Sequence, residues 1–118
     1  MTEKQFRKIA LGMDGAIESS HMNHPDFRAN GRIFATLRGD GKHGMVALTP
    51  EQQAEFIKAA PAAFAPESGA WGRQGCTRVT LAAAEHELLG EAMTLAWQIA
   101  MAKKPAKKQA NAATRRRP

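Results

Sequence analysis

The fold of this chain is decided by residues 24–38, which read HPDFRANGRIFATLR. This stretch consists of two segments with alternating apolar residues, joined by Asn30-Gly31. An Asn-Gly pair between such segments is the strongest short-range hairpin signal, because both residues tolerate the positive φ that a type I′ turn requires. The sequence therefore predicts a β-hairpin with arms at residues 25–29 and 32–38.

The segment before the hairpin begins with a helix. Thr2 and Gln5 match a capping box, in which each side chain bonds the backbone N–H of the other residue. Apolar residues at helical spacing follow as far as Met13, and Gly12 and Gly15 end the helix. Residues 16–22 then predict a short strand that leads into the hairpin.

The segment after the hairpin predicts one more strand and a second helix. A turn at residues 39–42 precedes the strand, which we expect at 43–49. Thr49 suits the N-cap position, and Pro50 suits the first helical position, where its missing N–H loses no hydrogen bond. We expect this helix to end near Pro61.

The last part of the folded region completes the pattern. Residues 62–76 are rich in glycine and proline and are expected to be irregular, and residues 77–81 predict a last strand. Apolar residues at helical spacing predict a long helix over 83–102, which Pro105 ends. The resulting order, α-β-β-β(-β)-α-β(-β)-α, predicts a two-layer α+β fold in which helices cover an antiparallel sheet.

Size and composition narrow the class of protein. A chain of 118 residues allows one domain, which we expect at residues 1–102. No apolar run approaches the roughly 20 residues that span a bilayer, and the first residues lack the apolar core of a signal peptide. Cys76 is the one cysteine, so an intramolecular disulfide is excluded. These features favour a cytoplasmic protein with no membrane partner.

The net charge of +6 is unevenly distributed along the chain. Residues 1–102 contain 10 basic and 11 acidic residues and are nearly neutral, whereas residues 103–118 contain seven basic residues and no acid. The seven are Lys103, Lys104, Lys107, Lys108, Arg115, Arg116 and Arg117. We expect this tail to be disordered, because it has no large apolar residue to bury, and to attract polyanions such as DNA.

Three segments of the chain resemble one known family. They are HPDFRANGRIFATL at 24–37, GMVALTPEQQAEF at 44–56 and WGRQGCTRVTLAAA at 71–84. In this order they resemble the MmcQ/YjbR-like family of small bacterial proteins, over residues 3 to 100 and without the tail. The resemblance implies a two-layer α+β fold, similar to frataxin-like and secretion-chaperone-like architectures, and a DNA-binding label. It implies no catalytic residue, and Cys76 departs from the small residue expected at its position.

The folded part offers six cations for contacts with nucleic acid, namely Arg28, Arg32, Arg38, Lys42, Arg73 and Arg78. Aromatic rings could lie between them, as on stacking surfaces for single strands; the candidates are Phe27, Phe34 and Trp71. Alternatively the rings lie in the core and the cations pair with Asp26, Asp40 and Glu67. Because this part is nearly neutral, we expect only Arg28, Arg32 and Arg73 to contact nucleic acid.

The glycine-rich stretch Trp71-Gly72-Arg73-Gln74-Gly75 has two interpretations. Its backbone N–H groups could hold a phosphate, but it lacks the spacing and the Lys-Ser/Thr end of a P-loop. We therefore expect a structural role, in which Trp71 fastens the loop to the core and the glycines allow tight turns.

The histidines and the cysteine are the remaining candidates for metal binding or catalysis. His21, His24 and Asp26 are of the donor types that bind zinc or iron, but on an extended strand His21 points away from the other two. We expect no metal, no cofactor and no catalytic residue, since nothing places a histidine beside Cys76. A ligand-binding or turn-stabilising site at the hairpin is the alternative, and its candidates are His24, Asp26, Phe27 and Trp71.

Two functions follow from these patterns. The first is a non-enzymatic DNA-binding module, with phosphate contacts from the tail and from the hairpin arginines. The second is a module that binds a protein partner or a small ligand, with a non-specific basic tail. The nearly neutral folded part favours the second, and the tail favours the first.

Overall fold

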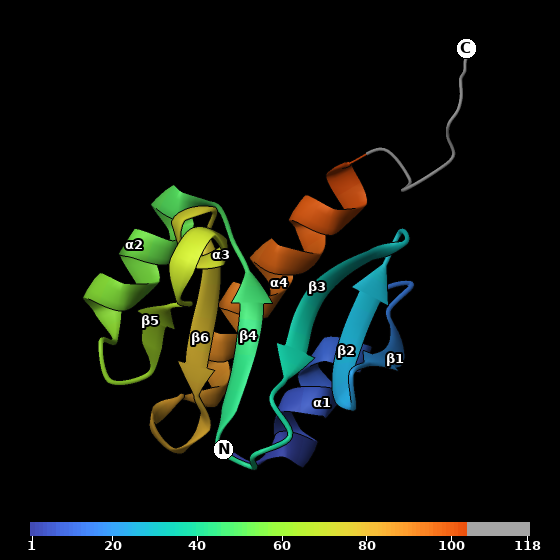
Figure 1. Ribbon diagram of the computed structural model, residues 1–118, viewed down its shortest axis with the longest axis horizontal. Coiled ribbons are helices and arrows are strands. Elements are labelled where there is room, and N and C mark those ends of the chain that lie inside the picture. Colours follow the sequence, from blue (N-terminus) through green and yellow to red (C-terminus); the bar gives the residue numbers. More distant parts are fainter. Residues whose placement is uncertain (104–118) are drawn as a thin grey trace.

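A computed structural model of the chain describes residues 1–103, and its six strands form one antiparallel sheet in the order β1-β2-β3-β4-β6-β5 (Figure 1). The strands are β1 (Ile17–His21), β2 (His24–Ala29), β3 (Arg32–Leu37), β4 (His43–Ala47), β5 (Phe64–Pro66) and β6 (Cys76–Thr80). The helices are α1 (Glu3–Leu11), α2 (Pro50–Ala59), α3 (Gly69–Arg73) and α4 (His86–Ala102), with a 3₁₀ turn at Leu81–Ala83. The predicted α+β class and antiparallel sheet are confirmed.

The helices are distributed unequally over the two faces of the sheet. Figure 1 shows α1 and α4 behind the sheet, α2 beside its β5 edge and the short α3 in front of β6. The core lies between the sheet and the long helices, where residues such as Phe6, Phe34 and Leu89 are fully buried. Among residues 1–103, α3 is the one helix over the front face.

The register of the strands shows which residues belong to each face. Phe27, Ala35 and Val46 lie side by side on neighbouring strands and all point into the core. Neighbouring residues of a strand point to opposite faces, so the residues next to these three point to the other face of the sheet. The row of cross-strand partners on that face is Ser19, Asp26, Thr36, Met45, Arg78 and Ala65. We call this second side of the sheet the open face.

The local signals at the helix starts are confirmed. Thr2 and Gln5 form both hydrogen bonds of a capping box, and Thr49 and Gln52 form a second one ahead of α2. Pro50 occupies the first helical position, as predicted. These bonds satisfy backbone donors that the first helical turn otherwise leaves without a partner.

The structure has a hairpin turn between β1 and β2 that the sequence did not indicate, beside the predicted turn between β2 and β3. Asn30-Gly31 adopts φ values of 56° and 73°, which confirms the predicted turn. Met22 and Asn23, with φ values of 51° and 66°, form a second tight turn between β1 and β2. The predicted strand at 16–22 therefore continues one residue too far, because Met-Asn is not one of the residue pairs, such as Asn-Gly, that signal a two-residue hairpin turn.

Two further boundaries differ from the prediction. Residues 62–76 are not irregular, since they contain β5 and α3. The last helix begins at His86 instead of residue 83, because Leu81–Ala83 forms a 3₁₀ turn. Both elements are short and are fixed by contacts with the rest of the fold, which local propensity does not report.

The predicted tail falls almost wholly outside the described residues. Lys103 is described, and the other six tail cations, Lys104, Lys107, Lys108, Arg115, Arg116 and Arg117, lie beyond that part of the chain. Within residues 1–103, no helix combines the length and apolar character needed to cross a membrane.

Candidate functional site

Three shallow depressions run into one another from the C-terminal end of α4 onto the open face. The first, of about 390 Å³, and the second, of about 480 Å³, share Ile33 and Ala47 in their walls. The third, of about 330 Å³, shares His21, Thr36 and Arg38 with the second. We call the three together the furrow.

The first part of the furrow has a basic rim, which consists of Arg28, Arg32 and Lys103. The turn of the β2–β3 hairpin holds this rim together, because the Asn30 side-chain amide donates to the backbone oxygens of Ala100, at 3.1 Å, and Lys103, at 2.7 Å. Two arginines from the hairpin and the first lysine of the tail therefore meet at one place. The other six tail cations follow directly in sequence.

Only part of the Arg28 guanidinium is available at the rim, because two of its nitrogens donate to Asp26. Its Nε donates to Oδ1 of Asp26 at 2.7 Å, and one terminal nitrogen donates to Oδ2 at 3.1 Å. His21 Nδ1 lies 2.7 Å from the same Oδ2. Asp26 is fully buried, and the Arg28 guanidinium, followed by His21, lowers the pKa of its carboxyl group against the effect of burial. The predicted alternative, pairing of Arg28 with Asp26, is confirmed.

The histidines lie on the open face, but with separate partners. His21 and His24 are opposite each other across the β1–β2 turn, so the prediction that His21 points away from its neighbours is wrong. His21 contacts Asp26, whereas His24 Nδ1 lies 2.6 Å from the backbone oxygen of Arg38. Among residues 1–103, no three His, Cys, Asp or Glu side chains are grouped so that they could hold a metal ion.

The aromatic candidates separate into two groups. Phe27 and Phe34 have no exposed surface and belong to the core, which confirms the alternative interpretation for these two rings and shows that Phe27 is not a ligand contact. Trp71 is 69% exposed and lines the second depression, so its predicted role in fastening the loop to the core is also wrong.

The loop around Trp71 is fastened by its backbone instead. The Gln53 side chain donates to the backbone oxygens of Gly72, at 3.0 Å, and Cys76, at 2.9 Å. A Cβ at Gly72 would lie 1.7 Å from the backbone oxygen of Glu67, and one at Gly75, where φ is 113°, would lie 1.9 Å from that of Leu48. The glycines of this motif therefore allow α3 to lie against the neighbouring backbone, and that packing orients Trp71 outward.

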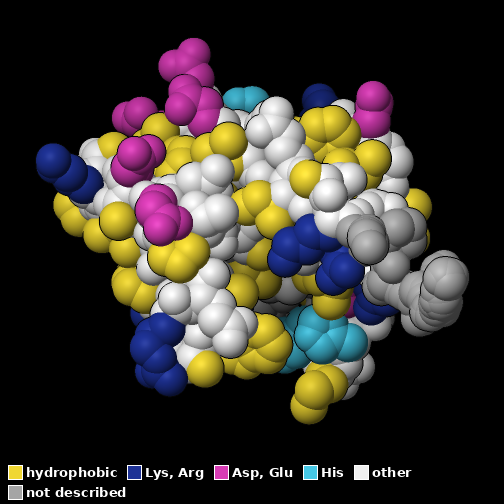
Figure 2. Space-filling view, turned by 90° about the horizontal axis from the view of Figure 1, so that it is seen from above, with side chains coloured by type: hydrophobic (Ala, Val, Ile, Leu, Met, Phe, Trp, Pro, Cys, Tyr) yellow, Lys and Arg dark blue, Asp and Glu magenta, His cyan; other side chains and the backbone are white. Residues whose placement is uncertain are grey.

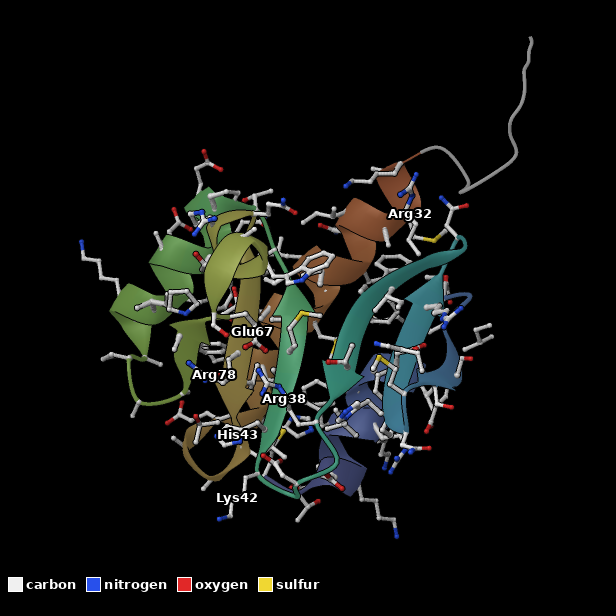
Figure 3. All side chains as sticks on the ribbon, in the orientation of Figure 1. Arg32, Arg38, Lys42, His43, Glu67 and Arg78 are labelled. Atoms are coloured by element: carbon white, nitrogen blue, oxygen red, sulfur yellow. The ribbon has the colours of Figure 1, made fainter. Side chains whose placement is uncertain are left out.

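An ion pair lies on the open face, in the wall of the depression that Trp71 also lines. Arg38 pairs with Glu67, and the Glu67 side chain is 11% exposed while that of Arg38 is 41% exposed. Figure 3 shows Arg38, Glu67 and Arg78 together over β4 and β6. The arginine is therefore the more exposed member of this ion pair, and the carboxylate is the more buried one.

Cys76 lies in the wall of the same depression and is half-buried. Burial, and next the negative charge of Glu67, raise the pKa of its thiol. A raised pKa keeps the thiol protonated, and this is the opposite of what a cysteine nucleophile requires.

Figure 2 shows some of the Lys and Arg side chains beside histidine side chains near the centre of the view, whereas most Asp and Glu side chains in the view lie toward its upper left. Other Lys and Arg side chains lie at the left and lower left, so the two signs of charge are only partly separated on this face. Figure 3 places Arg32 beside the C-terminal end of α4, on the basic rim. Arg73, the third arginine predicted to contact DNA, is exposed at the end of α3 and does not line the furrow.

Comparison with known proteins gives a family and a fold. The model of the YjbR family matches residues 11–99. The chain is also similar to the crystal structure of the Deinococcus radiodurans protein DR2400, described as a DUF419 domain, with a TM-score of 0.70 and 21% identity over 86% of this chain and 80% of that one. No curated protein matches the sequence.

Proposed function

The chain belongs to the YjbR family, and from its surface we propose that it is a non-enzymatic DNA-binding module of the cytoplasm. DNA phosphates are held electrostatically by the basic rim and by the tail that begins there. One observation carries this proposal: Arg28, Arg32 and Lys103 line a single depression, and the tail continues directly from it with six more cations.

The distribution of acids supports the same assignment. Asp26 is buried and paired with Arg28, and Glu67 is 11% exposed and paired with Arg38, so each of these two acids is balanced by an arginine. Cations on one surface that are followed in sequence by a tail rich in lysine and arginine are typical of sequence-independent phosphate binding. Because α4 ends at the rim, the tail and the folded part can contact the same DNA molecule.

The test compares DNA binding of the full chain with that of a truncation ending at Lys103, each titrated against duplex DNA across salt concentrations. Plots of log affinity against log salt have a negative slope, and each phosphate contact adds about 0.9 to its magnitude. Removal of the six tail cations should therefore reduce the magnitude of the slope by up to about 5. The truncation keeps every residue of the core. We expect it to bind more weakly but to retain a measurable slope.

Arg32 gives the matched test of the folded part. Arg32→Ala in the truncated protein removes a cation from the rim, whereas Lys58→Ala removes one from the last turn of α2, away from the furrow. Arg32→Ala is expected to weaken binding and Lys58→Ala to leave it unchanged. Equal effects of the two variants, or loss of all binding with the tail, would show that the folded part does not bind DNA, and would favour a protein or small-ligand partner.

A further inference from the structure

Trp71 is a large apolar side chain that the fold holds outside the core. It stands on α3, whose backbone is fixed by Gln53 and by the close contacts at Gly72 and Gly75. A ring of this size loses roughly 2–3 kcal/mol of burial free energy when it remains exposed. An aromatic residue that is exposed and rigidly placed at the edge of a depression is the usual anchor of a binding surface.

The wall beside the ring suits a flat apolar group. Ile33, Met45 and Ala47 line the same depression as Trp71, and Ile33 is 37% exposed. Together they form an apolar strip on the open face, next to the indole ring. A planar group inserted here would contact the indole ring and the aliphatic side chains.

The polar residues of the furrow favour an anionic occupant. Arg38, His21 and His24 line the third depression of the furrow, and the basic rim lines the first depression. The acid among the residues lining these depressions is Glu67, and it is paired with Arg38. Arginines and a lysine along a depression, together with an exposed aromatic ring, have the composition of a surface that binds single-stranded nucleic acid.

We propose that the furrow binds single-stranded nucleic acid, with one base stacked on Trp71 and backbone phosphates at Arg38 and the basic rim. This inference rests on the proposed function and makes it more specific. A single strand is required because only an unpaired base exposes a ring face to an aromatic side chain, whereas duplex bases are already stacked on one another. Duplex DNA would contact the rim and the tail alone.

The test uses the full chain and two probes of equal length, a labelled oligothymidine and a duplex. Trp71→Ala is compared with Trp71→Phe, which keeps an aromatic ring. Stacking of one base is worth about 5- to 150-fold in affinity, so Trp71→Ala should weaken oligothymidine binding by that factor while Trp71→Phe retains most of it. The salt slope should not change, because neither variant alters a charge.

Intrinsic fluorescence gives a second readout. The chain has two tryptophans, and Trp97→Phe leaves Trp71 as the single reporter. Oligothymidine should quench this reporter in a saturable way, and the duplex should not. Because Trp71 is 69% exposed, its variants should keep the unfolding temperature of the wild type, which confirms that they fold.

The outcomes separate this inference from the proposed function. If Trp71→Ala binds oligothymidine as tightly as the wild type, the stacking site is wrong, although DNA binding through the rim and tail stands. If the wild type binds neither probe, the proposed function fails, and the inference fails with it. If Trp71→Ala weakens duplex and oligothymidine binding equally, Trp71 supports general affinity, and the preference for a single strand is wrong.

Discussion

At the scale of single residues, Asp26 explains why the hairpin carries so many charged groups. Its carboxylate is fully buried and receives two hydrogen bonds from Arg28. A buried carboxylate without a partner is costly. Arg28 therefore serves the fold as well as the basic rim, and its removal alone would not be a clean test of DNA binding.

Arg28→Ala should lower the free energy of unfolding by about 1–3 kcal/mol, because Asp26 remains buried without its principal hydrogen-bond donor. Arg73→Ala is the matched control, since Arg73 is exposed at the end of α3. Its effect should stay within about 0.5 kcal/mol. Urea unfolding of the two variants and the wild type measures both values, and equal stabilities would contradict the structural role of Arg28.

The same carboxyl group makes stability dependent on pH. Arg28 and His21 hold the pKa of Asp26 below its ordinary value of 3.8, so the folded state binds fewer protons than the unfolded state as the pH falls. The stabilisation is complete above that ordinary value and is lost as the pH falls through the lower pKa of the folded protein.

Unfolding temperatures measured from about pH 6 down to about pH 2 should therefore decline, and they should decline less in Asp26→Asn, which has no carboxyl group to protonate. The variant is less stable at neutral pH, so the comparison concerns the slope and not the absolute temperature. Parallel acid slopes in the two proteins would assign the acid sensitivity to other groups, such as Asp40, whose pKa is lowered by His43 and by backbone N–H groups.

At the scale of elements, α3 shows a helix that depends on its neighbours. It has five residues, too few for independent stability, and its N-cap residue Ser68 makes no side-chain capping bond. The close approach at Gly72 and the amide of Gln53 hold it against the β5–β6 edge. The orientation of Trp71 follows from these contacts.

Gly72→Ala and Gly90→Ala should change stability in opposite directions. A Cβ at position 72 would lie 1.7 Å from a backbone oxygen of Glu67, so α3 must move and the cost should exceed about 2 kcal/mol. Position 90 lies inside α4 with nothing within 4 Å of a Cβ, so alanine should stabilise the protein by about 0.5–1 kcal/mol. Thermal unfolding distinguishes the two, and a neutral Gly72→Ala would mean that α3 is not held as described.

The elements also show what sequence can predict. The Asn30-Gly31 turn and the capping boxes at Thr2 and Thr49 are local, so their residues alone predict them. The turn at Met22 and the helix α3 depend on strand register and on distant backbone, which a linear pattern does not contain. Predictions were therefore correct where the cause lies within a few residues.

At the scale of the whole molecule, the candidate site also combines features that nearby residues determine with features that depend on distant parts of the chain. The sequence indicated Arg28 and Arg32 beside the hairpin turn, and the structure brings them to Lys103 through the side chain of Asn30. That meeting joins residues about 70 positions apart, and no local pattern predicts it. The sequence left two roles open for Trp71, a surface contact and an anchor in the core, because a tryptophan in a glycine-rich loop is compatible with both.

If the rim binds DNA, the position of a charge should matter more than the net charge. Lys103→Glu and Lys58→Glu each change the net charge by the same amount, and both residues lie at the C-terminal end of a helix, α4 and α2 respectively. Both helix ends disfavour the new acid, so their effects on stability should be similar. Lys103→Glu places a negative charge on the rim and should reduce DNA affinity about tenfold or more at low salt, whereas Lys58→Glu should change it about twofold or less. Filter binding at low and high salt measures both, and equal losses would show that DNA responds to the overall charge of the chain and not to this surface.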